Sequence, residues 1–241
     1  MKRSVFFVVA LCCCSFIFAQ QASNSSTANH ENRPLYFGVS VGLTVDWFAP
    51  HSDSLSRNAA KIGFIGGINL DVSLNKERIV YFSTGLLFRY LQGELSFTNE
   101  YHIMNTSLVV PAVRTYQTMY LTIPTGVKLR TLPSKNCVFS GKLGFYHNFK
   151  IGGNQFDNFT YHEPYFITTE KVKNRDAALF AESAYIGLGF EHALGNTARI
   201  FANIDYSCQF YYFNRNAKNE FTGTRFRSMV HSLHVVFGVM F

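Results

Sequence analysis

Apolar and polar residues alternate strictly in the stretch LYFGVSVGLTVDWF, which spans residues 35–48. Every second residue from Leu35 to Trp47 is large and apolar, whereas the residues between them include glycines, hydroxyls and Asp46. Because successive side chains of a β-strand point to opposite faces, this pattern predicts a strand with one apolar face and one face of small and polar groups.

The same period of two recurs along the chain and predicts eight strands, near 35–48, 61–74, 79–97, 117–130, 137–151, 179–194, 198–213 and 229–241. The connections alternate between long (49–60, 98–116, 152–178, 214–228) and short (75–78, 131–136, 195–197). Long loops at one end and tight turns at the other are typical of membrane barrels. We therefore expect an all-β protein, an eight-stranded antiparallel up-and-down transmembrane β-barrel with long extracellular loops and short periplasmic turns.

Alternation alone also fits a soluble, lipocalin-like ligand carrier, whose polar face would meet water. The polar face here is rich in Gly, Ser, Thr and Asn, which suit the narrow interior of an eight-stranded barrel. The apolar face is nearly free of charge, as lipid requires, because a charge at the bilayer midplane costs ~2–4 kcal/mol. These features favour the outer membrane. Aromatic residues at strand ends are candidates for interfacial girdles, although ordinary packing is the favoured interpretation of each one: Tyr36, Trp47, Tyr90, Tyr211, Tyr212 and Phe213.

The N-terminus predicts export. Lys2 and Arg3 precede an apolar segment at residues 4–18, and the small Ala19 follows, so residues 1–19 are expected to be a signal peptide. The apolar segment is shorter than the ~20 residues of a spanning helix, which disfavours a membrane anchor. A lipoprotein would acylate one of Cys12, Cys13 or Cys14, but no small residue directly precedes any of them. Residues 20–34 are expected to be a flexible periplasmic leader and 35–241 the barrel domain.

The signal ending FAQQ, the strand YFGVSVGLTVDWF, the hairpin GFIGGINLDVSLNKERIVYFSTGLLFRYLQG and especially YLTIPTGVKLR resemble the outer-membrane β-barrel family of the Bacteroidetes, often called PorT-like. The last motif matches the family's YL-x-IP-x-x-x-K strand through Tyr120, Leu121, Ile123, Pro124 and Lys128. The resemblance covers residues 35–241 and implies location in the cell outer membrane. One branch of the family serves type IX secretion, and most members have no assigned activity.

The C-terminal strand carries a partial assembly signal. Phe237, Val239 and Phe241 resemble the terminal motif that the barrel-assembly machinery reads, although Val236 stands where the usual motif has a glycine. We therefore expect this machinery to be a partner.

Charged residues on the polar face are expected to line the lumen and to pair there, because unpaired buried ions are expensive. Eight strands leave no channel of porin width, so we favour a structural network over a path for ions. The expected lumen residues are Asp46, Lys61, Asp71, Arg89, Lys128, Arg130, Lys142, Lys150, Glu191, Asp205 and His234.

The outer loops carry a set of basic residues whose charge suits the phosphates of lipopolysaccharide. The alternative is that these residues merely form a solvated face. Its members are Lys171, Lys173, Arg175, Arg225 and Arg227. Other expected partners are outer-membrane lipid and a protein bound at the extracellular loops. The net charge of +7 falls to +5 once Lys2 and Arg3 are removed, and no nucleic-acid partner is expected.

Catalytic and metal chemistry are not expected. An enzyme at the rim would draw on His51, Ser52, Asp53, His162 and Glu163, but such loop residues are usually just solvated. His231 and His234 are three residues apart on a strand, so they point to opposite faces and cannot share a metal ion. Cys137 and Cys208 lie on strands that are not neighbours and are expected to stay free.

The pattern as a whole favours a non-enzymatic scaffold or surface-binding protein that presents its extracellular loops and needs no cofactor. An accessory component of protein secretion and a rim-located lipid-modifying enzyme are the alternatives.

Overall fold

The computed structural model describes residues 33–52, 55–103, 106–131, 136–159, 169–195, 197–214 and 226–241. The expected signal peptide and most of the leader lie outside these ranges. Within the described ranges, no helix has both the length and the apolar character that crossing a membrane requires.

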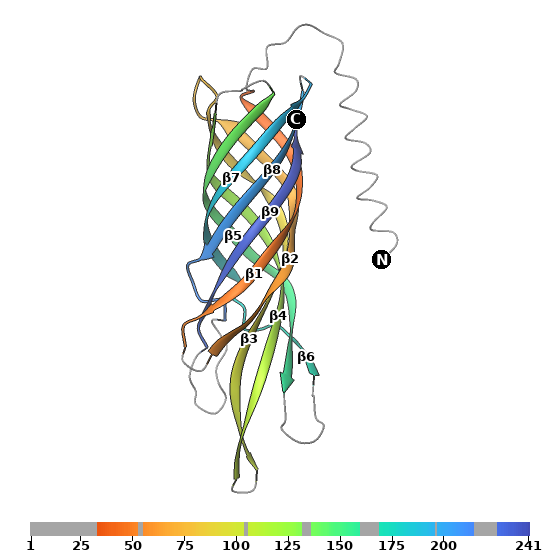
Figure 1. Ribbon diagram of the computed structural model, residues 1–241, viewed down its shortest axis with the longest axis vertical. Coiled ribbons are helices and arrows are strands. Elements are labelled where there is room, and N and C mark those ends of the chain that lie inside the picture. The colour runs from red at the N-terminus through yellow and green to blue at the C-terminus, as the bar shows by residue number, and fades with distance from the viewer. Residues whose placement is uncertain are drawn as a thin grey trace, which may run out of the picture.

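The described residues form nine antiparallel strands, eight of which close into a barrel (Figure 1). The strands are β1 (Leu35–Pro50), β2 (Leu55–Ser73), β3 (Val80–Ile103), β4 (Thr106–Arg130), β5 (Cys137–Phe159), β6 (Thr169–Lys173), β7 (Phe180–Leu194), β8 (Ala198–Gln209) and β9 (Ser228–Met240). The order is β4-β3-β2-β1-β9-β8-β7-β5, and pairing of β4 with β5 closes the ring. The short β6 pairs only with the far end of β5 among these strands. The predicted eight-stranded up-and-down barrel is confirmed.

The register around the ring sets the tilt of the strands. We follow the register once around the barrel by stepping from each residue to its partner on the next strand. Starting at Leu35 on β1, the steps pass through Val72, Phe82, Val127, Leu143, Ile186, Tyr206 and Leu233 and return to β1 at Val45. The end point, Val45, lies ten residues (45 − 35) further along β1 than the starting point, Leu35. Such a stagger of the register makes the strands run obliquely to the barrel axis. Most side chains on this path are apolar and exposed on the outer wall.

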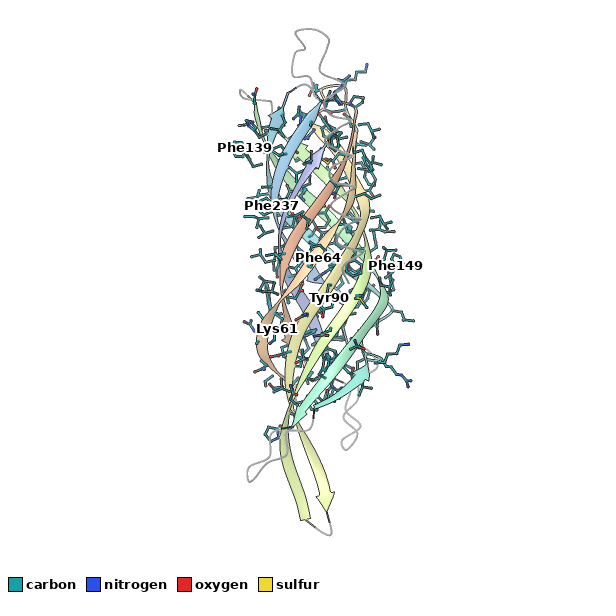
Figure 2. All side chains as sticks on the ribbon, turned by 90° about the vertical axis from the view of Figure 1, so that its right-hand side faces the viewer. Lys61, Phe64, Tyr90, Phe139, Phe149 and Phe237 are labelled. Carbon is teal, nitrogen blue, oxygen red and sulfur yellow. The ribbon has the colours of Figure 1, made fainter. Side chains whose placement is uncertain are left out.

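The apolar face points outward and the polar face inward. On β1, Val41 and Leu43 are 53% and 60% exposed, whereas Thr44 and Asp46 are fully buried. Figure 2 shows Phe139, Phe149 and Phe237 projecting from the outer wall. A soluble barrel has the opposite arrangement, with its apolar residues inside. The lipocalin-like alternative is therefore wrong, and the wall is built to contact hydrocarbon.

At the long-loop end the strands run further than the alternation predicted. The ladder between β3 and β4 continues from Gly93↔Tyr116 to Ile103↔Thr106, well past the last β2–β3 pair, Leu55↔Phe97. Much of the expected loop at 98–116 is therefore a β-hairpin that projects beyond the barrel (Figure 1). The expected loop at 152–178 likewise contains the end of β5 and all of β6.

Two leucines with nearly equal exposure test whether the wall meets lipid. Leu43 on β1 is 60% exposed, and Leu74 in the short turn after β2 is 58% exposed. Leu43→Arg should lower the free energy of unfolding in lipid vesicles by ~2–4 kcal/mol, because it places a charge in hydrocarbon. Leu74→Arg should change it by less than ~0.5 kcal/mol. Reversible denaturant titration measures both, and equal values for the two variants would contradict a lipid-facing wall.

Candidate functional site: the lumen and its outer mouth

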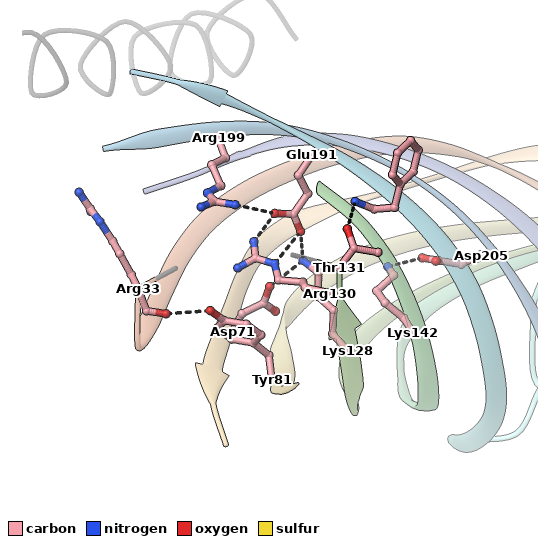
Figure 3. Close-up of polar contacts among 11 residues, drawn as sticks. Arg33, Asp71, Tyr81, Lys128, Arg130, Thr131, Lys142, Glu191, Arg199 and Asp205 are labelled. Carbon is pink, nitrogen blue, oxygen red and sulfur yellow. Dashed lines mark hydrogen bonds and ion pairs between the residues drawn. The ribbon is translucent and has the colours of Figure 1, made fainter. Parts of the chain in front are cut away.

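Charged side chains cluster in the lumen near the short-turn end (Figure 3). Lys128 on β4 places its Nζ 2.8 Å from Asp71 Oδ2 and 2.6 Å from Glu191 Oε1. Arg130, two residues further along β4, donates to both carboxylate oxygens of Glu191, and Arg199 lies 3.8 Å from the same carboxylate. The alternation of β2, β4 and β7 directs these side chains inward, and all of them are buried.

Two tyrosines close this end of the lumen. The Arg130 guanidinium lies 4.4 Å from the ring centroid of Tyr36 and 4.6 Å from that of Tyr81. The Tyr81 hydroxyl donates to the Arg33 carbonyl, and the Arg33 N–H donates to the Tyr36 hydroxyl, each at 2.9 Å. Tyr36 is buried in the lumen, which agrees with ordinary packing, and its candidacy for an interfacial girdle is wrong. Phe213 is also fully buried and is wrong as a girdle residue for the same reason.

A second group of pairs crosses the middle of the lumen. Arg89 on β3 donates to Asp46 Oδ1 at 2.8 Å and to Ser232 Oγ at 2.5 Å. Lys142 on β5 donates to Asp205 on β8 at 2.9 Å (Figure 3).

The remaining polar groups near Asp205 are also engaged. The Tyr146 hydroxyl donates to the Asp205 carboxylate at 3.3 Å. His234 Nε2 lies 2.9 Å from Ser207 Oγ. Gly187 leaves room for this group, since a Cβ at that position would overlap the Asp205 carboxylate.

The lumen pairs nearly balance in charge. Each of the lumen cations Arg89, Lys128, Arg130 and Lys142 contacts a buried carboxylate. Such pairing offsets the large desolvation cost of each ion and joins strands that are distant in sequence. This arrangement is that of a filled, cross-linked interior.

One expected lumen residue lies elsewhere. The β2–β3 register shifts between Ala60 and Phe64, and Lys61 is 37% exposed with its Nζ 2.8 Å from Glu94. Glu94 stands between the buried Gly93 and Leu95 and so faces away from the lumen, which makes the assignment of Lys61 to the lumen wrong. Lys150 lies between the exposed Phe149 and Ile151 and so faces inward at the outer mouth, where its ammonium donates to the carbonyls of residues 174 and 177, at 2.5 and 3.1 Å.

Apolar side chains fill the barrel at its outer mouth. Phe48 from β1, Tyr116 from β4 and Phe213 meet with ring centroids 4.9–5.5 Å apart. The whole cluster comprises Phe48, Leu55, Leu91, Leu95, Phe97, Ala112, Tyr116, Tyr120, Ala177, Phe213, Phe226 and Val230. We call it the mouth core. A signal for the mouth core is present in the sequence, since several of these strands carry large apolar residues on the inward face near Phe48 and Leu91.

An arginine connects the mouth core to the extended strands. Arg114 on β4 donates to both oxygens of Asp157 on β5, at 2.6 and 2.5 Å, and to Asp176 at 2.8 Å. The Tyr116 hydroxyl also donates to Asp176, at 3.2 Å.

Segment 174–178, which connects β6 to β7, is thereby fixed over the mouth. The Asn174 side-chain amide donates to Thr118 Oγ1 at 2.8 Å and its carbonyl oxygen accepts from the Ala177 N–H at 3.0 Å. Because this segment continues directly from β6, the same contacts hold β6 against the end of β5.

The basic residues of the rim are only partly described. Lys171 and Lys173 belong to β6, where Lys173 is exposed, and Arg175 is exposed just after the end of the strand. Arg227 is exposed next to β9, with its guanidinium 5.5 Å from the Tyr212 ring centroid. Arg225 lies outside the described residues.

The rim residues considered for catalysis form no such site in the described part of the chain. His51 Nδ1 lies 3.0 Å from the Ala49 carbonyl, and Ser52 Oγ accepts from the Arg227 N–H at 3.0 Å. Asp53, His162 and Glu163 lie outside the described residues.

The described histidines and cysteines offer neither a metal cluster nor a disulfide. No group of three or more His, Cys, Asp or Glu side chains in the described ranges is arranged to hold a metal ion. His231 contacts Tyr206 on the outer wall and His234 lies in the lumen, on opposite faces as predicted. Cys137 and Cys208 are free, also as predicted.

The last strand closes the barrel up to the final residue. Phe237 is exposed on the outer wall. Val239 pairs with Val39 on β1, and Phe241 exchanges two backbone hydrogen bonds with Phe37. The proposed assembly signal is therefore part of the β1–β9 seam.

These features define an integral outer-membrane β-barrel: a closed ring of strands, an apolar outer wall and a polar, ion-paired interior. The chain belongs to the outer membrane protein beta-barrel domain family, which it matches over residues 18–212. The protein is accordingly located in the outer membrane.

Solved structures with a similar fold share little sequence with this chain. Ail of Yersinia pestis, solved with the heparin analogue sucrose octasulfate, is 14% identical, with 87% of this chain and 100% of that chain covered and a TM-score of 0.35. Neisserial surface protein A is 11% identical, with 85% of this chain and 95% of that chain covered and a TM-score of 0.42. OprG of Pseudomonas aeruginosa is 11% identical, with 89% of this chain and 99% of that chain covered and a TM-score of 0.40. No curated protein matches the chain in sequence.

Glu191 tests whether the lumen pairs stabilise the barrel. Glu191→Ala leaves Arg130 and Lys128 without this carboxylate, and the free energy of unfolding should fall by ~3–5 kcal/mol. Glu77→Ala, in the exposed turn between β2 and β3, is the matched control and should have little effect. Denaturant titration in vesicles measures both, and a loss below ~1 kcal/mol for Glu191→Ala would show that the network contributes little.

Arg114 tests the attachment of segment 174–178. Arg114→Met should raise amide hydrogen exchange in residues 172–178 by roughly 10–100-fold, since hydrogen bonds to charged groups contribute ~1.5–3 kcal/mol. Exchange in β7 and β8 should not change. Arg57→Met, at an exposed position of β2, is the control. Unchanged protection of 172–178 would mean that other contacts hold the segment.

Proposed function

We propose that the protein is a scaffold of the outer membrane whose extracellular end binds a surface ligand or a protein partner and performs no catalysis at that end. The observation that carries this proposal is the extension of β3, β4, β5 and β6 beyond the barrel (Figure 1). These strands form one connected sheet outside the lipid-facing wall, with pairs such as Thr98↔Pro111, Ala112↔Phe159 and Asn158↔Thr169.

The filled interior supports a role outside the lumen. The pairs around Lys128 and Glu191 occupy one end, and the mouth core occupies the other. Eight strands enclose space for side chains rather than for an aqueous channel. A binding role at the outer end therefore fits better than transport.

The ligand that we propose for this end is the phosphate of lipopolysaccharide. Lys171, Lys173 and Arg175 adjoin the projecting sheet, and Arg227, with Arg225 beside it in sequence, precedes β9 at the same end of the barrel. Arginine and lysine suit phosphate groups through charge-assisted hydrogen bonds. The alternative is that these basic residues are only solvated and bind no ligand, and the experiment must distinguish the two.

Charge reversal tests this ligand. Lys171→Glu, Lys173→Glu and Arg175→Glu together should weaken lipid A binding in native mass spectrometry by at least ~10-fold, because three favourable charges become repulsive. Lys76→Glu, in the exposed turn at the opposite end, is the control and should bind like the parent protein. Equal binding by the triple variant would end the lipopolysaccharide proposal and leave a protein partner.

An accessory role in protein secretion is the second candidate, and the PorT-like resemblance of residues 120–130 supports it. Within that motif Tyr120, Pro124 and Lys128 are buried on the inward face, and Lys128 belongs to the ion-pair network. These positions serve the barrel itself, so the motif alone does not separate a secretion component from other members. Loss of secreted proteins after gene deletion, restored by the full chain, would favour the secretion role.

A further inference from the structure

Three polar side chains interrupt the apolar outer wall at adjacent strands. They are Thr125 on β4, His147 on β5 and Glu182 on β7. Their neighbours in sequence, such as Pro124, Asn148 and Ser183, are buried on the inward face, so the three point outward. The side chains of His147 and Glu182 are 29% and 32% exposed. We call this group the wall trio.

The wall trio forms one hydrogen-bonded chain. Thr125 Oγ1 lies 2.9 Å from His147 Nε2, and His147 Nδ1 lies 3.1 Å from Glu182 Oε1. A carboxylate can only accept, so Nδ1 carries the proton, and Nε2 of the neutral ring is left to accept from the threonine hydroxyl. A hydroxyl, a base and an orienting acid in this order constitute the arrangement that activates a nucleophile in acyl-transfer enzymes.

The surroundings of the wall trio are apolar. Phe145 and Phe149 flank His147 on β5, and Phe180 and Ile186 lie on either side of Glu182 along β7, all of them exposed. The His147 ring lies parallel to that of Phe180, with an interplanar angle of 5° and centroids 6.5 Å apart. Ionisable groups within a lipid-facing surface are costly, and they commonly mark a functional site.

We propose that the wall trio cleaves acyl esters of membrane lipids that reach it sideways from the bilayer. This inference goes beyond the proposed function and concerns the wall rather than the extracellular end. Two sources share the required chemistry: glycerophospholipids and the ester-linked acyl chains of lipid A. The outer wall is where the acyl chains and ester groups of either lipid contact the protein.

The reaction proceeds in two balanced steps. As Thr125 Oγ1 attacks the ester carbonyl, His147 takes the hydroxyl proton, and it then returns that proton to the departing alcohol oxygen of the lipid. The products are a lyso-lipid and an acyl ester on Thr125. A water molecule, deprotonated by His147, next attacks the acyl-threonine; fatty acid leaves and the Thr125 hydroxyl is restored.

Glu182 acts as a positioning residue that holds the imidazole and stabilises its protonated form.

The experiment uses the full chain, refolded into vesicles of phosphatidylethanolamine or of phosphatidylethanolamine with lipid A. Mass spectrometry measures released fatty acid, lyso-lipid and acylation of the peptide that contains residue 125. Both Thr125→Val and His147→Gln should lower product formation by ~10²-fold or more. Thr125→Ser should remain active, because it keeps the hydroxyl.

His231→Gln is the matched control, since His231 also faces outward and contacts a hydroxyl, that of Tyr206. It should retain activity. Heat-dependent migration in gel electrophoresis confirms that each variant is folded. Product from phosphatidylethanolamine alone identifies a phospholipid substrate, and product that requires lipid A identifies its acyl esters.

Absence of product with both lipids, or equal product from folded Thr125→Val and the parent protein, would overturn the proposal and leave the wall trio a structural hydrogen-bond chain. Neither result bears on the extracellular end, whose lipid A binding is measured separately with the charge-reversal variant.

Discussion

Closure of the backbone hydrogen-bond ladder is the constraint on which the rest of this structure depends. Hydrocarbon offers no partner to a peptide N–H or C=O, so a strand at a free edge would leave a row of unpaired groups in lipid. Pairing of β4 with β5 and of β1 with β9 removes both edges, and the second seam continues to Phe241. Once the ring is closed, the period of two leaves each residue either facing lipid or facing the lumen.

The lumen must then hold every polar side chain that lipid excludes. The carboxylates of Asp71, Glu191 and Asp205 could not stay charged in so narrow a space without nearby cations. Lys128, Arg130 and Lys142 supply them from strands far away in sequence. The ion pairs are therefore a consequence of the apolar exterior, and their net contribution is mainly to fix which strands face each other.

The period of two was enough to predict the barrel, the faces of the strands and most of the lumen residues, though not which of them pair, because closure makes that period the dominant signal. It failed where local geometry intervenes. A register shift turns Lys61 toward Glu94, and no residue type marks that shift in advance. The hairpin beyond Thr98 lies outside lipid, so its faces need not differ in polarity. His147 and Glu182 did interrupt the apolar face of their strands, but their separation of 35 residues hid that they meet.

The lumen and the wall trio are coupled through the same strands. Directly behind the trio, Thr122 Oγ1 donates to Asn148 Oδ1 at 2.8 Å, and the Asn148 amide donates to the Ala181 carbonyl at 3.1 Å. These inward contacts join β4, β5 and β7, the three strands that carry Thr125, His147 and Glu182. A side chain that must keep its position at a lipid surface needs a backbone that does not shift, and the buried contacts on the opposite face provide it. The polar interior is thus also the support on which an outward-facing arrangement of polar groups can be held.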